Sequence, residues 1–241
     1  DIIELVSEED VEFIRLQFVD IYGILKNVAV TASQLERILN NELTFDCGAI
    51  EGLENKNLSK LILAPDLDTF AIFPWRPQSN RVARFICDVQ NIDGSPFEKD
   101  PRNVLKTVLK KAAKEGYFFN VGPELEFFLF DTDENGEATC NTTEKGGIFD
   151  VGPVDRGENA RSDMVLSLSD MGFEIEASYH SDEAAQHQID FKYASPLNTA
   201  DNIMTFKLAV HTVAKRHGLH ATFMPKPRTD LNGSGLHTHI T

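Results

Sequence analysis

Two glutamates one residue apart lie inside an otherwise apolar segment, Val121 to Phe130. The segment is short and rich in aromatic residues, and it contains a Gly-Pro turn signal near its start, a pattern that predicts a buried strand. Because side chains alternate along a strand, Glu124 and Glu126 are expected on the same face. Two neighbouring carboxylates that leave water repel each other, so something positive must compensate them. We expect a divalent cation there; the alternative is an exposed strand end where both acids are solvated.

A glycine-rich segment, Asn232 to His239, carries a second set of candidate residues. Gly233 and Gly235 allow positive φ and a close approach of a ligand to the backbone. His237 and the histidine that ends the segment lie two residues apart, so they share one face of a strand. Imidazoles together with a carboxylate suit a catalytic divalent ion. The residues alone also allow a hairpin turn with surface histidines.

Three weaker signals complete the set of candidates. Glu174 and Glu176 lie at the start of another expected strand, where a solvated edge is the simpler interpretation. Asp46 lies in a glycine-containing loop, and Lys226 stands between two prolines that hold an extended chain. Neither a Gly-x-x-x-x-Gly-Lys-Ser/Thr loop nor a Gly-x-Gly-x-x-Gly loop occurs, so a bound nucleotide would depend on metals and isolated side chains.

The elements that position these residues indicate an α+β fold. The first hundred residues read as strands with a short helix over Ser33–Leu39, and a turn cluster at Asp93–Pro96 is the candidate domain boundary. A helix then begins with Asp100 as N-cap and Pro101 at its first position. Helices are also expected over 158–171 and 200–217, and short strands over 60–63, 70–73, 173–179 and 187–193.

The composition of the chain argues against several classes of protein. The chain has 241 residues, enough for one large or two ordinary domains, and a formal net charge of −15 that argues against nucleic acid or anionic membranes as partners. It contains no apolar run of the roughly 18 residues that a membrane span needs, and no signal peptide is visible. Three widely spaced cysteines, Cys47, Cys87 and Cys140, indicate free thiols in a reducing cytoplasm.

Several of these segments together resemble type I glutamine synthetases. Gly122 to Phe130 is similar to the metal-binding strand of that family, Phe45 to Gly52 to its Phe-Asp-Gly-Ser-Ser-Ile-Glu-Gly loop, and Asn232 to His237 to its Asn-Gly-Ser-Gly-Met-His segment. Phe73-Pro74-Trp75, 81–88, 100–103 and Met224–Pro227 match as well. The resemblance runs over the whole chain but covers only the N-terminal part of a family member. We therefore expect a partial chain, an interpretation that the apparently unfinished strand at Thr241 also favours.

The resemblance implies an N-terminal β-grasp domain over 1–98 and the truncated first part of a catalytic α+β domain over 99–241. It implies a cytoplasmic enzyme that phosphorylates glutamate with ATP and lets ammonia displace the phosphate, aided by magnesium or manganese. It further implies a homo-oligomer, a dodecamer of two stacked six-membered rings with each active site between neighbouring subunits.

The resemblance also implies roles for individual residues. Glu126 would bind one ion, and Glu124 with His237 the other. Asp46 would bind and deprotonate ammonium in the site of a neighbouring subunit. The remaining roles concern the nucleotide and glutamate: Glu176 on the ribose, Tyr193 near the adenine, His239 at the phosphates, and Asn232 with Gly233 at the backbone end of glutamate.

One departure from the family pattern affects the first ion. Ser181 and Gln188 stand where family members carry the two glutamates that bind this ion together with Glu126. Losing two negative charges should weaken divalent binding severely, and Glu183 is the better candidate for a compensating carboxylate. The family residues that would complete the site lie beyond Thr241. Two functions therefore remain open, an ATP-dependent glutamate–ammonia ligase and a non-catalytic scaffold or regulatory paralogue with a degraded metal site. A weaker third is a relative that ligates another amine or acid.

Overall fold

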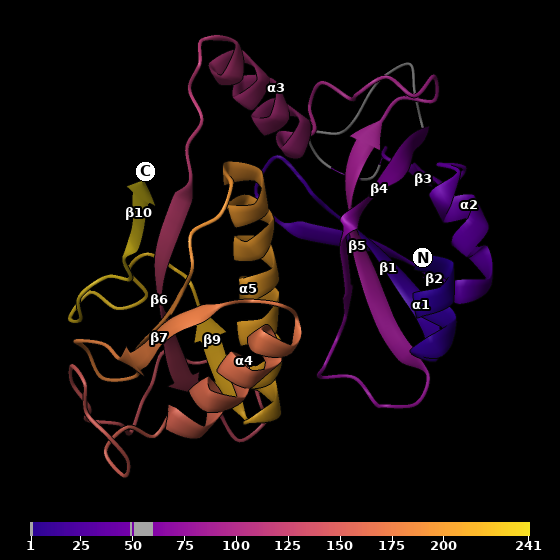
Figure 1. Cartoon of the computed structure of the whole chain (residues 1–241). Helices are drawn as coiled ribbons and strands as arrows, with labels where there is room; N and C mark the ends of the chain where they lie inside the picture. Colours follow the sequence, from indigo (N-terminus) through magenta and orange to yellow (C-terminus); the bar gives the residue numbers. More distant parts are fainter. Residues whose placement is uncertain (1, 49, 51–59) are drawn as a thin grey trace. The chain divides into compact units, whose positions relative to one another are not determined.

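The computed structural model describes residues 2–48, 50 and 60–241, and the chain forms two compact units, 1–118 and 119–241 (Figure 1). The elements of the first unit are α1 (Ile2–Glu8), β1 (Val11–Val19), β2 (Leu25–Thr31), a 3-10 turn (Ala32–Gln34), α2 (Leu35–Leu39), β3 (Thr44–Asp46), β4 (Lys60–Ile72), β5 (Arg81–Gln90) and α3 (Pro101–Lys114).

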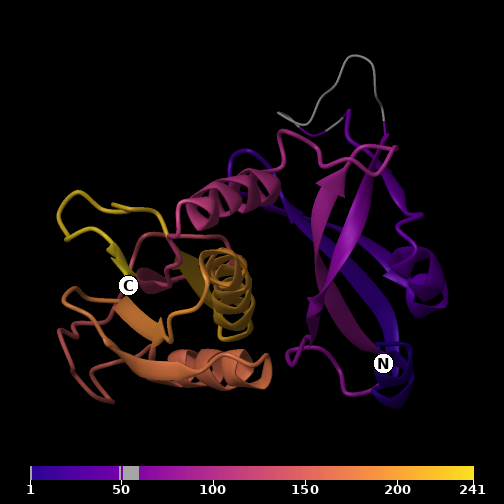
Figure 2. The same ribbon diagram turned by 45° about the horizontal axis from the view of Figure 1, so that its top comes forward.

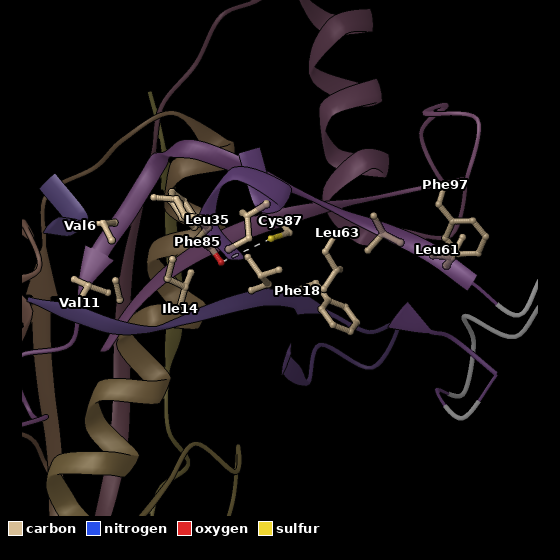
Figure 3. Close-up of a cluster of buried hydrophobic side chains, with 14 of the residues drawn as sticks. Val6, Val11, Ile14, Phe18, Leu35, Leu61, Leu63, Phe85, Cys87 and Phe97 are labelled. Atoms are coloured by element: carbon tan, nitrogen blue, oxygen red, sulfur yellow. Dashed lines mark hydrogen bonds between the residues drawn. The ribbon is translucent and has the colours of Figure 1, made fainter. Parts of the chain in front are cut away.

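The first unit is built on a five-stranded sheet in the order β2-β1-β5-β4-β3. The central strands β1 and β5 run parallel, whereas the other pairs are antiparallel. Ile14, Leu16 and Phe18 alternate along β1 and are fully buried, as the sequence pattern predicts. They pack with Phe85 and with residues of α1 and α2 in one apolar cluster, shown in Figure 3.

Strand β4 differs from the prediction of two short strands at 60–63 and 70–73. It is one continuous strand, and its register against β5 shifts between Asp66 and Ala71. Such an irregularity lets polar residues interrupt the apolar pattern without ending the strand. The Asp66 carboxylate at this irregularity forms an ion pair with Arg102 of α3, at 2.6 Å from Nη2. Nη1 of the same arginine contacts Asp88 at 2.5 Å.

Helix α3 begins as its sequence predicts. The Asp100 carboxylate accepts a hydrogen bond from the Arg102 backbone N–H at 3.2 Å, and Pro101 occupies the first turn. A second bond ties the cap to the sheet, since the other carboxylate oxygen accepts the backbone N–H of Val89 at 3.1 Å. Gly116, at φ +84°, follows the end of the helix, where a left-handed conformation favours glycine.

The second unit places a sheet against two helices. Its elements are β6 (Val121–Asp131), α4 (Glu158–Asp170), β7 (Ile175–His180), β8 (Gln186–Phe191), α5 (Pro196–Arg216), β9 (Leu219–Thr222) and β10 (Leu236–Ile240). The sheet order is β10-β6-β8-β7, and β9 also pairs with β6. Figure 2 shows α4 and α5 side by side. Phe206 of α5 packs on Phe127 with ring centroids 6.1 Å apart, so the odd-numbered residues of β6 face the helices.

Helix α5 starts earlier than the predicted residue 200. Ser195 caps it by accepting the Asn198 N–H at 3.4 Å, and Pro196 is its first residue. The Ser-Pro pair is an N-terminal signal of the same kind as Asp100-Pro101. Both units combine helices with mainly antiparallel sheets, which confirms the α+β class. None of the described helices is long and apolar enough to cross a membrane.

We predict that Asp100→Ala lowers the free energy of unfolding by about 2 kcal/mol, because it removes the cap of α3 and leaves the Val89 N–H without its acceptor. Asp100→Asn keeps one carbonyl oxygen and should lose less. Urea denaturation of the two variants beside the wild type measures this. Equal stability of Asp100→Ala and the wild type would contradict the structural role of this carboxylate.

Candidate functional site

The two glutamates of β6 share one face of the second sheet, opposite the face that the helices cover. Glu124 lies across from Asp190 of β8 and His237 of β10, and Glu126 lies across from Gln188. The strand and the shared face are therefore as predicted. The acids are half-buried, however, and not in the dry interior that the apolar sequence suggests. Further along the same face, Phe128 and Phe130 are fully buried in a cluster with Ala185, against which Leu231 packs.

Glu124 is compensated by two histidines of β10. Nε2 of His239 donates to its Oε1 at 2.9 Å, and Nδ1 of His237 lies 3.3 Å from its Oε2. The imidazoles are 63% and 68% exposed. A carboxylate and an imidazole that can turn towards solvent are donors that suit a divalent ion. Glu124 and His237 thus fit the second ion that the resemblance implies, with further ligands required from elsewhere.

Glu126 is compensated in another way, by donors of the protein itself. Its Oε1 accepts a hydrogen bond from the Ser181 hydroxyl, and its Oε2 accepts the Gly235 N–H at 2.6 Å and Nε2 of Gln186 at 3.2 Å. Nε2 of Gln188 donates instead to Oδ1 of Asp190 at 2.8 Å. The residues around Glu126 do not fit the first ion, because one carboxylate already engaged by three donors would have to supply all of the negative charge.

Glu183 does not replace the missing carboxylates. Strand β7 ends at His180, and Glu183 lies in the loop that follows, where its Oε1 accepts the Asn232 backbone N–H at 3.0 Å. Gly233 next to it requires glycine, because a Cβ there would lie 2.5 Å from the Pro225 carbonyl oxygen. Asn232 and Gly233, the two residues expected to bind the substrate glutamate, are therefore positioned by the bond to Glu183 and by close packing against Pro225.

A cavity of about 340 Å³ adjoins Glu124. Its lining includes Glu176, Tyr193 and His239, the three residues expected at the nucleotide, which the fold brings together from β7, β10 and the segment after β8. The family resemblance implies this convergence, whereas the spacing of the three residues in the sequence does not, because they lie far apart in the chain. Asp46 belongs to the other unit, at the end of β3, and accepts the Gly48 N–H at 2.9 Å; residues 49, 51 and 52 of its loop lie outside the described residues.

Asp190 is a residue of this face to which the sequence reasoning gave no role. It lines the same cavity, and its two oxygens accept hydrogen bonds from Gln188 and, at 3.4 Å, from the Tyr179 hydroxyl. Burial raises its pKa, and the charges of Glu124 and Glu176 add to this. Burial and then Asp190 raise the pKa of Tyr179 to about 12. The signal that could have found Asp190 is its spacing of two from Gln188 in a strand.

A second polar group lies on the opposite face, behind the site. Among the described residues, ligand atoms of Glu144, Asp155, His180 and His187 come within 4.8 Å of one another, and all four are buried. Nε2 of His180 lies 2.6 Å from Oε1 of Glu144, and Nη1 of Arg161 lies 2.7 Å from Oδ2 of Asp155. Nδ1 of His180 lies 2.8 Å from the Ser181 carbonyl oxygen, so both ring nitrogens face acceptors and the ring carries both protons. His180 and Arg161 therefore neutralise the two carboxylates, and the group is already compensated.

Proton positions within this group also disfavour a metal ion. Nη1 of Arg161 can only donate, so Nδ1 of His187 at 2.9 Å must accept, which places the ring proton of neutral His187 on Nε2. That nitrogen then has no lone pair for a metal. Burial and then Arg161 lower the pKa of His187. Burial alone would lower the pKa of His180, but Glu144 raises it overall, and His180 in turn keeps the pKa of Glu144 low against the effect of burial.

Comparison with known proteins identifies the class. The model of the glutamine synthetase β-grasp domain matches residues 10–92, and that of the glutamine synthetase catalytic domain matches residues 98–241. The chain belongs to the glutamine synthetase family, and the expected β-grasp domain followed by a catalytic domain is confirmed. The compact units divide instead after Phe118, so that α3 groups with the first; the boundary at 98 stays a prediction.

Individual relatives also support membership of this family. A glutamine synthetase of Clostridium saccharobutylicum is 60% identical over 241 residues, and one of Staphylococcus aureus is 54% identical over 242 residues; each match covers 100% of this chain and 54% of the relative. A solved GmaS/ADP complex superposes with a TM-score of 0.89 and 31% identity over 100% of this chain and 55% of that one. The Plasmodium falciparum glutamine synthetase, at 24% identity and a TM-score of 0.88, shares the fold over 99% of this chain and 52% of that one. The chain spans about half the length of these relatives.

We predict that Glu144→Gln lowers the free energy of unfolding by about 3 kcal/mol near pH 6, because it leaves the buried His180 cation unpaired. The contribution of the carboxylate is present above its ordinary pKa of 4.5 and is lost as the pH falls towards the lowered value. The contribution of His180 is present below 6.5 and is lost as the pH rises through its raised pKa.

The difference between wild type and variant should therefore shrink on acidification, which urea denaturation at several pH values measures. Glu137→Gln, on the exposed hairpin at 131–138, is the matched control and should change stability little. A Glu144→Gln cost no larger than that of the control would contradict the buried ion pair.

Proposed function

We propose that this chain is the N-terminal part of an ATP-dependent glutamate–ammonia ligase that acts through a γ-glutamyl phosphate. The observation that carries the proposal is the cavity beside Glu124, where Glu176, Tyr193 and His239 meet. A relative of the same fold in a complex with ADP supports a nucleotide on this scaffold. The family membership and the relatives named glutamine synthetase support the reaction.

In this proposal each residue binds or positions a reactant. Tyr193 lies against the adenine, Glu176 accepts hydrogen bonds from the ribose hydroxyls, and His239 donates to a phosphate oxygen. Glu124 and His237 hold magnesium or manganese, which neutralises charge on the transferring phosphoryl group. Asn232 and Gly233 bind the backbone end of glutamate.

The remaining parts of the site would come from elsewhere. The relatives are about twice as long, so further ligands and phosphate-binding residues would lie in the rest of a longer polypeptide. Asp46 would bind and deprotonate ammonium in the site of a neighbouring subunit. This requires a homo-oligomer, for which the family resemblance supplies a dodecamer of two six-membered rings, and a cytoplasmic location fits the three free thiols.

A second candidate function has a specific observation in its favour. Ser181 and Gln188 remove two carboxylates from the first ion, and three protein donors engage Glu126. A non-catalytic scaffold or regulatory paralogue would retain nucleotide binding and assembly without turnover. Glutamine formation by the complete polypeptide from ATP, glutamate and ammonium separates the two, because the ligase requires it and the paralogue excludes it.

We predict that Glu176→Ala weakens binding of a non-hydrolysable ATP analogue about tenfold, which corresponds to the loss of one hydrogen bond of roughly 1.4 kcal/mol. Isothermal titration of the complete polypeptide measures this. Glu174→Ala is the matched control, because Glu174 lies two residues away and bonds the exposed Lys192 at 2.8 Å. Equal effects of the two substitutions, or no effect of Glu176→Ala, would contradict the placing of the nucleotide.

A further inference from the structure

Glu126 joins three segments that are distant in the sequence. The Ser181 hydroxyl follows β7, the Gln186 amide begins β8, and the Gly235 N–H precedes β10, and all three donate to this one carboxylate. Gln186 also donates to the Gly233 carbonyl oxygen at 3.1 Å, which ties the glycine-rich segment to the same place. Hydrogen bonds from several neutral donors can stabilise a carboxylate without any cation.

The surroundings of Glu124 have a different chemistry. Its hydrogen-bond partners among the described residues, His237 and His239, are imidazoles on exposed side chains, and an imidazole can exchange a proton for a metal. A backbone N–H cannot do so, and a serine hydroxyl or an amide brings no charge to an ion. An ion at Glu126 would have to displace three hydrogen bonds and would find one carboxylate there.

We propose that the Glu126 half of this face holds no divalent ion and is closed by Ser181, Gln186 and Gly235, so that the protein binds one divalent ion per chain, at Glu124 and His237. This inference rests on the proposed function for the ion at Glu124. Glu126 then acts as an internal tie that holds the glycine-rich segment against β6.

The test counts manganese ions bound per chain in the complete polypeptide without nucleotide, by electron paramagnetic resonance of the free ion during titration. The wild type should bind one ion, and Ser181→Glu with Gln188→Glu should bind two, because the added carboxylates supply the missing charge. Gln78→Glu with Ser79→Glu is the matched control, since it makes the same two changes in an exposed loop and should bind one.

A second pair of variants tests which of the two glutamates binds the ion, and its result does not depend on how the double variant folds. Glu126→Gln should bind as many ions as the wild type, whereas Glu124→Gln should lose the ion. The inference is overturned if Glu126→Gln lowers the count, if the wild type binds two ions, or if a folded Ser181→Glu, Gln188→Glu variant gains none.

These outcomes are distinguishable from failure of the proposed function. A wild type that binds no ion and no ATP analogue would refute the proposed function. In that case one ion gained by the double variant, with none in the exposed-loop control, still supports the closed Glu126 half.

Discussion

Two carboxylates on one face of one strand impose the constraint on which the rest of the second unit depends. Strand alternation places Glu124 and Glu126 side by side, and half-buried negative charges must be compensated. The protein meets this need twice in different ways. Two exposed imidazoles approach Glu124, and three neutral donors engage Glu126. Neighbouring acids of the same strand therefore have unlike chemistry, one open to a cation and the other closed.

The same alternation builds the support behind this face. Ser181 and Gln188 point towards the acids, while the residues beside them, His180 and His187, point to the opposite side and pair with each other across β7 and β8. There they meet Glu144 and Arg161 in the compensated buried group. Nδ1 of His180 also lies 2.8 Å from the Ser181 carbonyl oxygen, so the buried ion pair contacts the backbone of the residue whose hydroxyl bonds Glu126.

Local signals in the sequence predicted much of this arrangement. Asp100-Pro101 marks the start of α3, and the alternation of Glu124 with Leu125 and Glu126 gave the strand and its faces. The predicted buried strand is confirmed for Leu125 and for Phe127 to Phe130, but Glu124 and Glu126 are only half-buried, because the four apolar residues that follow Glu126 bury the later part of β6. The donors to Glu126 could not be predicted, since they come from three segments whose approach depends on tertiary packing. Asp155 and Glu144 lie in a loop without periodicity, so no pattern could reveal their burial.

The central claim is that different groups compensate the charges of Glu124 and Glu126. As a result Glu124 is an ion ligand, and Glu126 is an acceptor of structural hydrogen bonds. Anomalous diffraction from crystals of the complete polypeptide soaked in manganese tests it most directly. The account predicts one manganese peak, within bonding distance of Glu124 and His237, with the Ser181 hydroxyl still bonded to Glu126. A second peak on Glu126, with that hydrogen bond broken, would contradict it.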